Sequence, residues 1–148
     1  MASSVHTEIV RVNEEVLWGF IENKEAWATL IPGYLHHEIK TAEEMIWVFK
    51  GDFGIIEKAV KLQLNVKETF ENQKISFNLE GLSDNINGSG YFEMVKDGDY
   101  QYKLNGELTM KAGGFLASMI NPVLEKFVPQ TVEALVKSMS QRVESAVV

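Results

Sequence analysis

The feature that most constrains the fold is an alternation of apolar and polar side chains between residues 34 and 111. In its clearest segment every second residue is aliphatic and the intervening ones are polar: Val60, Leu62, Leu64 and Val66 against Lys61, Gln63, Asn65 and Lys67. Residues 74–80 and 100–110 alternate in the same way. Successive side chains of a strand point to opposite faces, so this pattern predicts strands with one dry and one wet face.

The turn residues between these segments predict an antiparallel meander. Asp97-Gly98-Asp99 separates two of the alternating segments and is a strong hairpin signal. If all strands cover the same core, their inward residues include Val60, Leu62, Leu64, Phe77, Leu79, Leu104 and Leu108. The outward residues then include Lys61, Gln63 and Lys103.

Helical patterns flank the meander on both sides. A strand at residues 5–12 leads to Asn13, which is placed to cap a first helix, and Asn23 to cap a second one that ends at Ile31-Pro32-Gly33. After Gly113-Gly114, apolar residues return at helical spacing as far as residue 143, which predicts a long amphipathic helix. Within it, Asn121-Pro122 resembles a cap and first helical position, and Pro129 a kink.

The order strand, two short helices, meander and long helix predicts an α+β fold with two layers, because the dry face of the sheet must be covered. At 148 residues the chain, 1–148, corresponds to one domain able to form a real core. A curved sheet crossed by one long helix readily leaves a cavity between them. The topology therefore predicts an internal apolar cavity.

Composition excludes several classes of function. The formal net charge of −7 opposes binding to nucleic acid, where attraction to phosphates dominates affinity. There are no cysteines, so disulfides and thiolate metal sites are ruled out. No segment approaches the roughly 20 apolar residues of a membrane span, and residues 1–8 do not resemble a secretory signal. We therefore expect a cytoplasmic domain without stable membrane insertion.

Three stretches carry a family resemblance: Ile31-Pro32-Gly33, Lys50-Gly51-Asp52-Phe53-Gly54-Ile55-Ile56-Glu57-Lys58, and Gly113-Gly114 before the last helix. With this element order, the chain resembles the G-subunit family of carbon monoxide dehydrogenase, within the SRPBCC superfamily of START domains, polyketide cyclases and the birch pollen allergen. The resemblance implies a helix-grip fold, in which a curved seven-stranded antiparallel sheet wraps around the long helix. It also implies a pocket for lipids, quinones or other apolar ligands.

Members of that family are thought to serve a molybdenum hydroxylase by membrane recruitment or quinone handling. This chain has no extended hydrophobic tail after Val148, which argues against anchoring in that manner. Transient membrane contact and an oxidoreductase partner stay open as expectations. The expected ligand-binding residues combine the predicted inward faces with the resemblance: Trp27, Ile31, His37, Phe53, Val60, Leu62, Leu64, Phe77, Leu79, Phe92, Leu104, Leu108, Phe115, Met119, Ile120, Val123 and Phe127.

Few residues indicate catalysis. His36 and His37 are adjacent on a strand and cannot both address one inward site, and the three histidines lack metal-binding spacing. Asp52 and Glu57 flank a glycine-containing bend and are better explained by structure than by acid-base chemistry. We expect no catalytic residues, no metal site and no cofactor.

Three functions are therefore weighed. The first is a noncatalytic binding or carrier protein for a hydrophobic small molecule, accessory to an oxidoreductase. The second is a cyclase- or isomerase-like enzyme, which buried polar groups converging on the cavity would favour. The third is an interaction module that recruits an oxidoreductase subunit, which an exposed apolar patch around Trp47 and Phe49 would favour.

Overall fold

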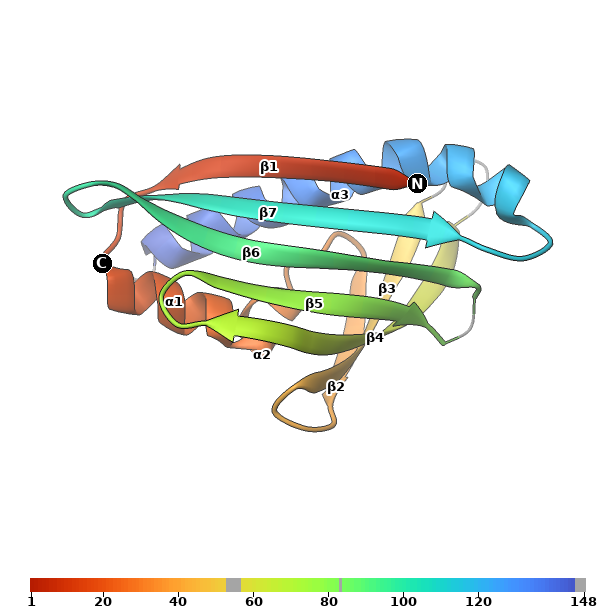
Figure 1. Ribbon diagram of the computed structural model, residues 1–148, viewed down its shortest axis with the longest axis horizontal. Coiled ribbons are helices and arrows are strands. Elements are labelled where there is room, and N and C mark those ends of the chain that lie inside the picture. The colour runs from red at the N-terminus through yellow and green to blue at the C-terminus, as the bar shows by residue number, and fades with distance from the viewer. Residues whose placement is uncertain (53–56, 83, 146–148) are drawn as a thin grey trace.

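The computed structural model describes residues 1–52, 57–82 and 84–145, and these form a curved sheet with three helices on one side (Figure 1). The elements in chain order are β1 (Ala2–Val10), α1 (Glu14–Glu22), α2 (Lys24–Ala28), β2 (Tyr34–Ile39), β3 (Glu44–Asp52), β4 (Glu57–Phe70), β5 (Lys74–Gly81), β6 (Ile86–Gly98), β7 (Gln101–Ala112) and α3 (Ala117–Ser145). The sheet has seven strands in the order β1-β7-β6-β5-β4-β3-β2. All neighbouring strands are antiparallel, which confirms the predicted helix-grip fold.

Asparagine side chains begin both short helices, as the sequence predicted. The Asn13 side-chain oxygen accepts a hydrogen bond from the backbone N–H of Val16 at 2.8 Å. Asn23 does the same for the backbone N–H of Glu25 at 3.2 Å. Each contact satisfies a backbone donor that has no partner inside the helix.

The alternation of strand faces is also confirmed. The predicted inward side chains are all buried: Val60, Leu62, Leu64, Phe77, Leu79, Leu104 and Leu108. Of the predicted outward residues, Lys61 and Lys103 are exposed. Gln63 is half-buried, and its side-chain amide donates hydrogen bonds to Glu44 and Asn65. The period of two therefore assigned the core face of the meander correctly.

The start of the long helix differs from the prediction. Helix α3 begins at Ala117, and both Pro122 and Pro129 lie inside it. Asn121 does not cap the helix, because its amide instead exchanges two hydrogen bonds with the backbone of Ala112 at the end of β7, at 2.8 and 3.0 Å. Each proline leaves the carbonyl four residues earlier without its helical donor. Those carbonyls belong to Ser118 and Glu125, which are exposed and accessible to water.

Helix α3 runs along β1 and β7, while α1 and α2 cover the strands farther across the sheet (Figure 1). Gly106 on β7 permits the close approach, since a Cβ atom there would lie 2.4 Å from the Cγ2 of Val136. On the other side, Trp27 of α2 packs against Phe77 and Phe92 of the sheet, with ring centroids 5.9 and 4.9 Å apart. Its indole N–H donates to the carbonyl of Ile21 at 2.9 Å. Both the long helix and α2 therefore pack directly on the inward face of the sheet.

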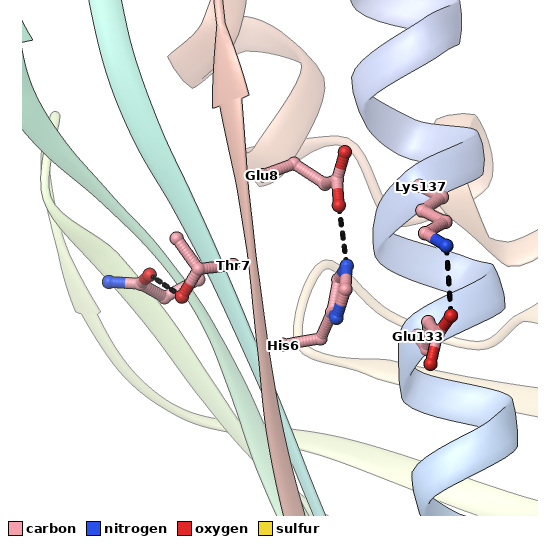
Figure 2. A network of polar contacts seen from close by, with 6 residues as sticks. His6, Thr7, Glu8, Glu133 and Lys137 are labelled. Carbon is pink, nitrogen blue, oxygen red and sulfur yellow. Dashed lines mark hydrogen bonds and ion pairs between the residues drawn. The ribbon is translucent and has the colours of Figure 1, made fainter.

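Polar side chains of the edge strand β1 and of α3 lie beside one another (Figure 2). His6 and Glu8 lie on β1, with His6 Nε2 and Glu8 Oε2 2.5 Å apart. On α3, Lys137 donates to Glu133 at 2.8 Å. That hydrogen bond lowers the pKa of Glu133 and raises the pKa of Lys137, so both side chains are charged at neutral pH. Charged and polar side chains therefore face each other along the line where β1 meets α3.

Candidate functional site

A cleft of about 350 Å³ opens between α3 and the β2–β3 side of the sheet. The loop before β2, the ends of β3 and β4, and the middle of α3 line it: Pro32, Gly33, Lys50, Asp52, Glu57, Phe127, Gln130 and Thr131. Lys50 Nζ lies 3.0 Å from Glu57 Oε2, and both side chains are more than half exposed. The entrance of this cleft is therefore polar and in contact with water.

A second space lies deeper, against the centre of the sheet. Its lining is almost wholly apolar: Ile31, Trp47, Phe49, Leu62, Leu79, Leu108, Met110, Phe127 and Thr131. Its volume of about 10 Å³ is no more than a single water molecule needs. Among the described residues, this space is far smaller than the internal cavity that the topology predicted.

Phe127 and Thr131 belong to the lining of both spaces. They lie one turn apart on α3 and so share one face of the helix. The Phe127 ring stacks on Phe49 of β3, with ring centroids 6.2 Å apart and planes 10° apart. Phe127 is half-buried, whereas Thr131 is 5% exposed. These two side chains form the wall between the polar cleft and the apolar interior.

The structure places most of the predicted ligand-binding residues in two settings. Those at the deeper space are Ile31, Leu62, Leu79, Leu108 and Phe127. Those buried elsewhere in the core are Trp27, Val60, Leu64, Phe77, Phe92 and Leu104. Phe53 lies outside the described residues. No ligand tests these assignments, so they stay predictions.

Phe115 and Met119 do not face the interior, contrary to the prediction. Their exposed fractions are 98% and 68%, because Phe115 lies before α3 and Met119 lies in its first turn, ahead of the part of the helix that packs on β7 and β1. Ile120 and Val123 are half-buried. Phe115 and Ile120 instead border a separate surface cleft of about 290 Å³ near the end of β7. The apolar stripe of the helix was thus predicted too far toward its start.

His37 also lies away from both spaces at the helix–sheet wall. It faces inward on β2, opposite Trp47, while the neighbouring His36 is exposed. Its Nδ1 lies 2.7 Å from the Tyr34 hydroxyl and its Nε2 3.1 Å from a carboxylate oxygen of Glu25. Both ring nitrogens are therefore occupied by contacts that join β2 to α2, and the prediction that His37 contacts the ligand is not supported by its position.

We expect His37→Ala to lower the free energy of unfolding by about 1–3 kcal/mol, since two hydrogen bonds that join α2 to the sheet are lost. Binding of an apolar probe should not change. Urea denaturation followed by tryptophan fluorescence measures the first quantity, and His36→Ala, at an exposed position on the same strand, is the matched control. Equal stability of both variants would show that the Tyr34–His37–Glu25 contacts contribute nothing.

The other residues considered for chemistry have structural surroundings. Asp52 and Glu57 face each other across β3 and β4 at the polar cleft. Trp47 and Phe49 are buried, so they form no exposed patch that could recruit a partner. Within residues 1–52, 57–82 and 84–145, no three histidine or carboxylate side chains are grouped so that they could hold a metal ion. In the same ranges no helix has both the length and the apolar character of a membrane span.

Several residues of the cleft were not identified from the sequence. Lys50, Gln130 and Thr131 are the polar members, and Met110 the apolar one at the deeper space. Thr131 interrupts the apolar helical stripe next to Val132, which was the only available signal. The polar members are ordinary surface residue types, and only the approach of α3 to β3 brings them together.

Comparisons with known proteins identify a family and several solved structures with a similar fold. The family model for the G-subunit of carbon monoxide dehydrogenase (CoxG) matches residues 7–144. A START superfamily protein from Mycobacterium smegmatis has a TM-score of 0.75 at 19% identity, with 99% of each chain covered. The Zhui aromatase/cyclase from a Streptomyces species has a TM-score of 0.73 at 13% identity, with 99% of this chain and 95% of that one covered.

A conserved protein from Geobacillus kaustophilus has a TM-score of 0.80 at 12% identity, covering 97% of this chain and 96% of that one. No curated protein sequence matches the chain. At these identities the solved structures show a shared fold, and fold alone does not determine activity. The family match and the cleft beside Phe127 are the two findings on which a function has to rest.

Proposed function

The chain belongs to the CoxG family of carbon monoxide dehydrogenase, and from this premise we propose that it binds a hydrophobic small molecule behind Phe127. The ligand is a lipid, a quinone or a similar apolar molecule. The protein binds and releases it without changing it chemically. Entry runs from the polar cleft, past the Phe127 ring, toward the apolar residues of the sheet. The single observation that carries this proposal is the wall that Phe127 and Thr131 form between the two spaces.

The volumes of the cleft and the deeper space support entry of a ligand past Phe127. The cleft of about 350 Å³ is already at the lower end of the roughly 300–1,000 Å³ usual for ligand pockets. The deeper space is too small for a ligand by itself, but it adds apolar surface next to Phe127. Rotation of the Phe127 ring away from Phe49 would join the two into one pocket. Binding therefore selects a conformation in which this wall is open.

The lining supports binding rather than catalysis. Apart from Thr131, every described residue around the deeper space is apolar. Proton transfer or nucleophilic attack needs a titratable or nucleophilic group within hydrogen-bond reach of the reacting atoms. The charged residues Lys50, Asp52 and Glu57 lie in the outer cleft, where water surrounds them.

The family name supports a further part of the proposal, that the bound molecule passes between this protein and an oxidoreductase. A carrier for such a molecule has to release it, so moderate affinity and rapid exchange are required. A gate formed by one aromatic ring suits that requirement better than a fully enclosed cavity. Native mass spectrometry of the purified protein, with extraction of any apolar molecule that copurifies, identifies the ligand.

We expect Phe127→Ala to accelerate both association and dissociation of a neutral apolar dye such as Nile red. Association should be faster because entry no longer waits for the ring to move. Dissociation should accelerate more, by about tenfold, since about 1.4 kcal/mol of apolar contact is lost. Stopped-flow fluorescence measures both rates.

The control for this experiment is Val143→Ala, in the buried stripe near the other end of α3. It should lower the free energy of unfolding by roughly 1–3 kcal/mol, because a buried side chain is truncated. The dye kinetics should stay as in the parent protein. Unchanged rates in the Phe127→Ala protein would refute the role of this ring as a gate.

A further inference from the structure

Strand β1 lies at one edge of the sheet, so among the described residues one long side of it has no neighbouring strand. Backbone N–H and C=O groups on such a side are available to pair with another strand. Val5 and Ile9 lie on the outward face of β1, and both are exposed. An edge strand with exposed apolar side chains is a place where a strand of a second chain can add.

Helix α3 lies beside this edge without enclosing it. Val136 packs above Gly106 of β7, the strand next to β1. Glu133 and Lys137 point toward β1, and both side chains are about half exposed (Figure 2). Water, or another protein surface, therefore reaches the line where β1 meets α3.

The polar side chains along this line form two aligned pairs. His6 and Glu8 are two residues apart on a strand, and Glu133 and Lys137 are four apart on a helix. Both spacings span about 6–7 Å. His6 therefore lies level with Glu133, and Glu8 lies level with Lys137 (Figure 2). The hydrogen bond from Lys137 is the main cause of the lowered pKa of Glu133, and nearby His6 adds to it.

We infer that this edge binds the same edge of a second copy of the chain, with the two β1 strands antiparallel across a two-fold axis at Thr7. This register places Val5 opposite Ile9 of the partner subunit on the outward face. On the inward face it places His6 opposite Glu8 of the partner subunit, where the imidazole can donate to the carboxylate. The interface is isologous, so each of these pairs occurs twice.

The helices support the same axis and make the pairing selective. The axis passes midway between Glu133 and Lys137, so it brings Glu133 toward Lys137 of the partner subunit. Inward-facing charged side chains on an edge strand hinder pairing with most other strands, because those charges stay unmatched. An antiparallel copy of β1 in this register matches them.

This inference is independent of the proposed function. The outer cleft lies on the β2–β3 side of the sheet, and β1 is at the other end of the strand order. Both copies of a pair joined through β1 therefore keep the cleft open.

Sedimentation velocity of the full chain from 1 to 100 µM should show a dimer. In Val5→Lys two apolar cross-strand pairs are lost, so the dissociation constant of the dimer should rise about tenfold. The fold should not change, because Val5 is exposed. The matched control is Val95→Lys, at an exposed position on the interior strand β6, which should leave association unchanged. A parent protein that stays monomeric, or equal effects of both substitutions, would overturn the inference.

The register has its own test, because the chain contains no cysteine. Directly opposite residues of antiparallel strands have Cα atoms about 4.5–5.5 Å apart, within reach of a disulfide. Thr7→Cys lies on the axis and should form an intermolecular disulfide under mild oxidation, seen on a non-reducing gel. Ser3→Cys is also exposed but would lie about 27 Å from its symmetry mate and should not. Equal crosslinking of both variants would contradict this register.

A mixing experiment tests the helix contacts. Glu133→Lys and Lys137→Glu each bring like charges together across the axis, so each protein alone should associate about fivefold more weakly. An equimolar mixture of the two restores opposite charges in both contacts and should form dimers again. A mixture that associates no better than either protein alone would overturn the proposed arrangement.

Discussion

Leu62→Asp should leave little or no folded protein. Leu62 is 1% exposed, lies on the inward face of β4 opposite Trp47, and borders the deeper space. The substitution removes a buried aliphatic side chain, at about 2–5 kcal/mol, and adds a carboxylate that has no partner, at several kcal/mol more. Domains of this kind are stable by only about 5–15 kcal/mol in total. Circular dichroism during heating should therefore show no cooperative transition.

The matched control is Lys61→Asp, one residue earlier on the same strand. Lys61 points to the opposite face and is exposed, so its replacement should change the free energy of unfolding by no more than about 0.5 kcal/mol. Both variants introduce the same side chain, and the comparison isolates the effect of the face. A Leu62→Asp protein that melts like its control would mean that water reaches the inward face of β4.

Gly33→Ala is the second substitution with a large expected effect, about 2–4 kcal/mol lost from the free energy of unfolding. Gly33 has a φ of 76°, in the left-handed region that favours glycine. A Cβ atom there would lie 2.1 Å from the carbonyl oxygen of Lys50, which is backbone and cannot rotate away. The same two residues are joined by a hydrogen bond from the Lys50 N–H to the Gly33 carbonyl at 2.7 Å.

Because Gly33 and Lys50 both line the outer cleft, this substitution should also disturb dye binding in whatever protein remains folded. Gly19→Ala is the control. Gly19 lies inside α1, where an added Cβ would have no atom within 4 Å. There the change should raise stability by about 0.5–1 kcal/mol, since alanine favours the helix. Urea denaturation of both proteins gives the comparison, and equal effects would exclude strain at Gly33.

The experiment on Phe127 addresses a different question from these two. Leu62 and Gly33 test whether the sheet and the cleft are built as described, through stability. Phe127 tests the path of the ligand through the rates of association and dissociation. A loss of folding therefore cannot be mistaken for a loss of binding.

Local patterns were enough for most of the architecture. The inward set on β4, β5 and β7 followed from the period of two, because side chains of a strand alternate without regard to distant parts of the chain. The caps at Asn13 and Asn23 followed for a similar reason, since each acts on backbone within three residues. The family resemblance supplied the number of strands and the helix-grip arrangement.

Errors appeared where a distant segment competes with a local signal. Asn121 followed by Pro122 resembles a helix start. The Asn121 side chain instead forms two hydrogen bonds with the backbone of Ala112, and the helix begins earlier, at Ala117. His37 faced inward as its strand required, yet Tyr34 and Glu25 bound both of its ring nitrogens.

By itself, the sequence determined the fold class, the element order and the dry face of the sheet, because these depend on residue types at short spacing. Only the tertiary structure decided how closely α3 approaches the sheet, and hence how small the space between the described apolar side chains is. It also decided that Phe127 and Thr131 stand between a polar cleft and an apolar space. Such a wall depends on distances between α3 and strands that are far from it in the chain, and no local pattern in a sequence encodes those distances.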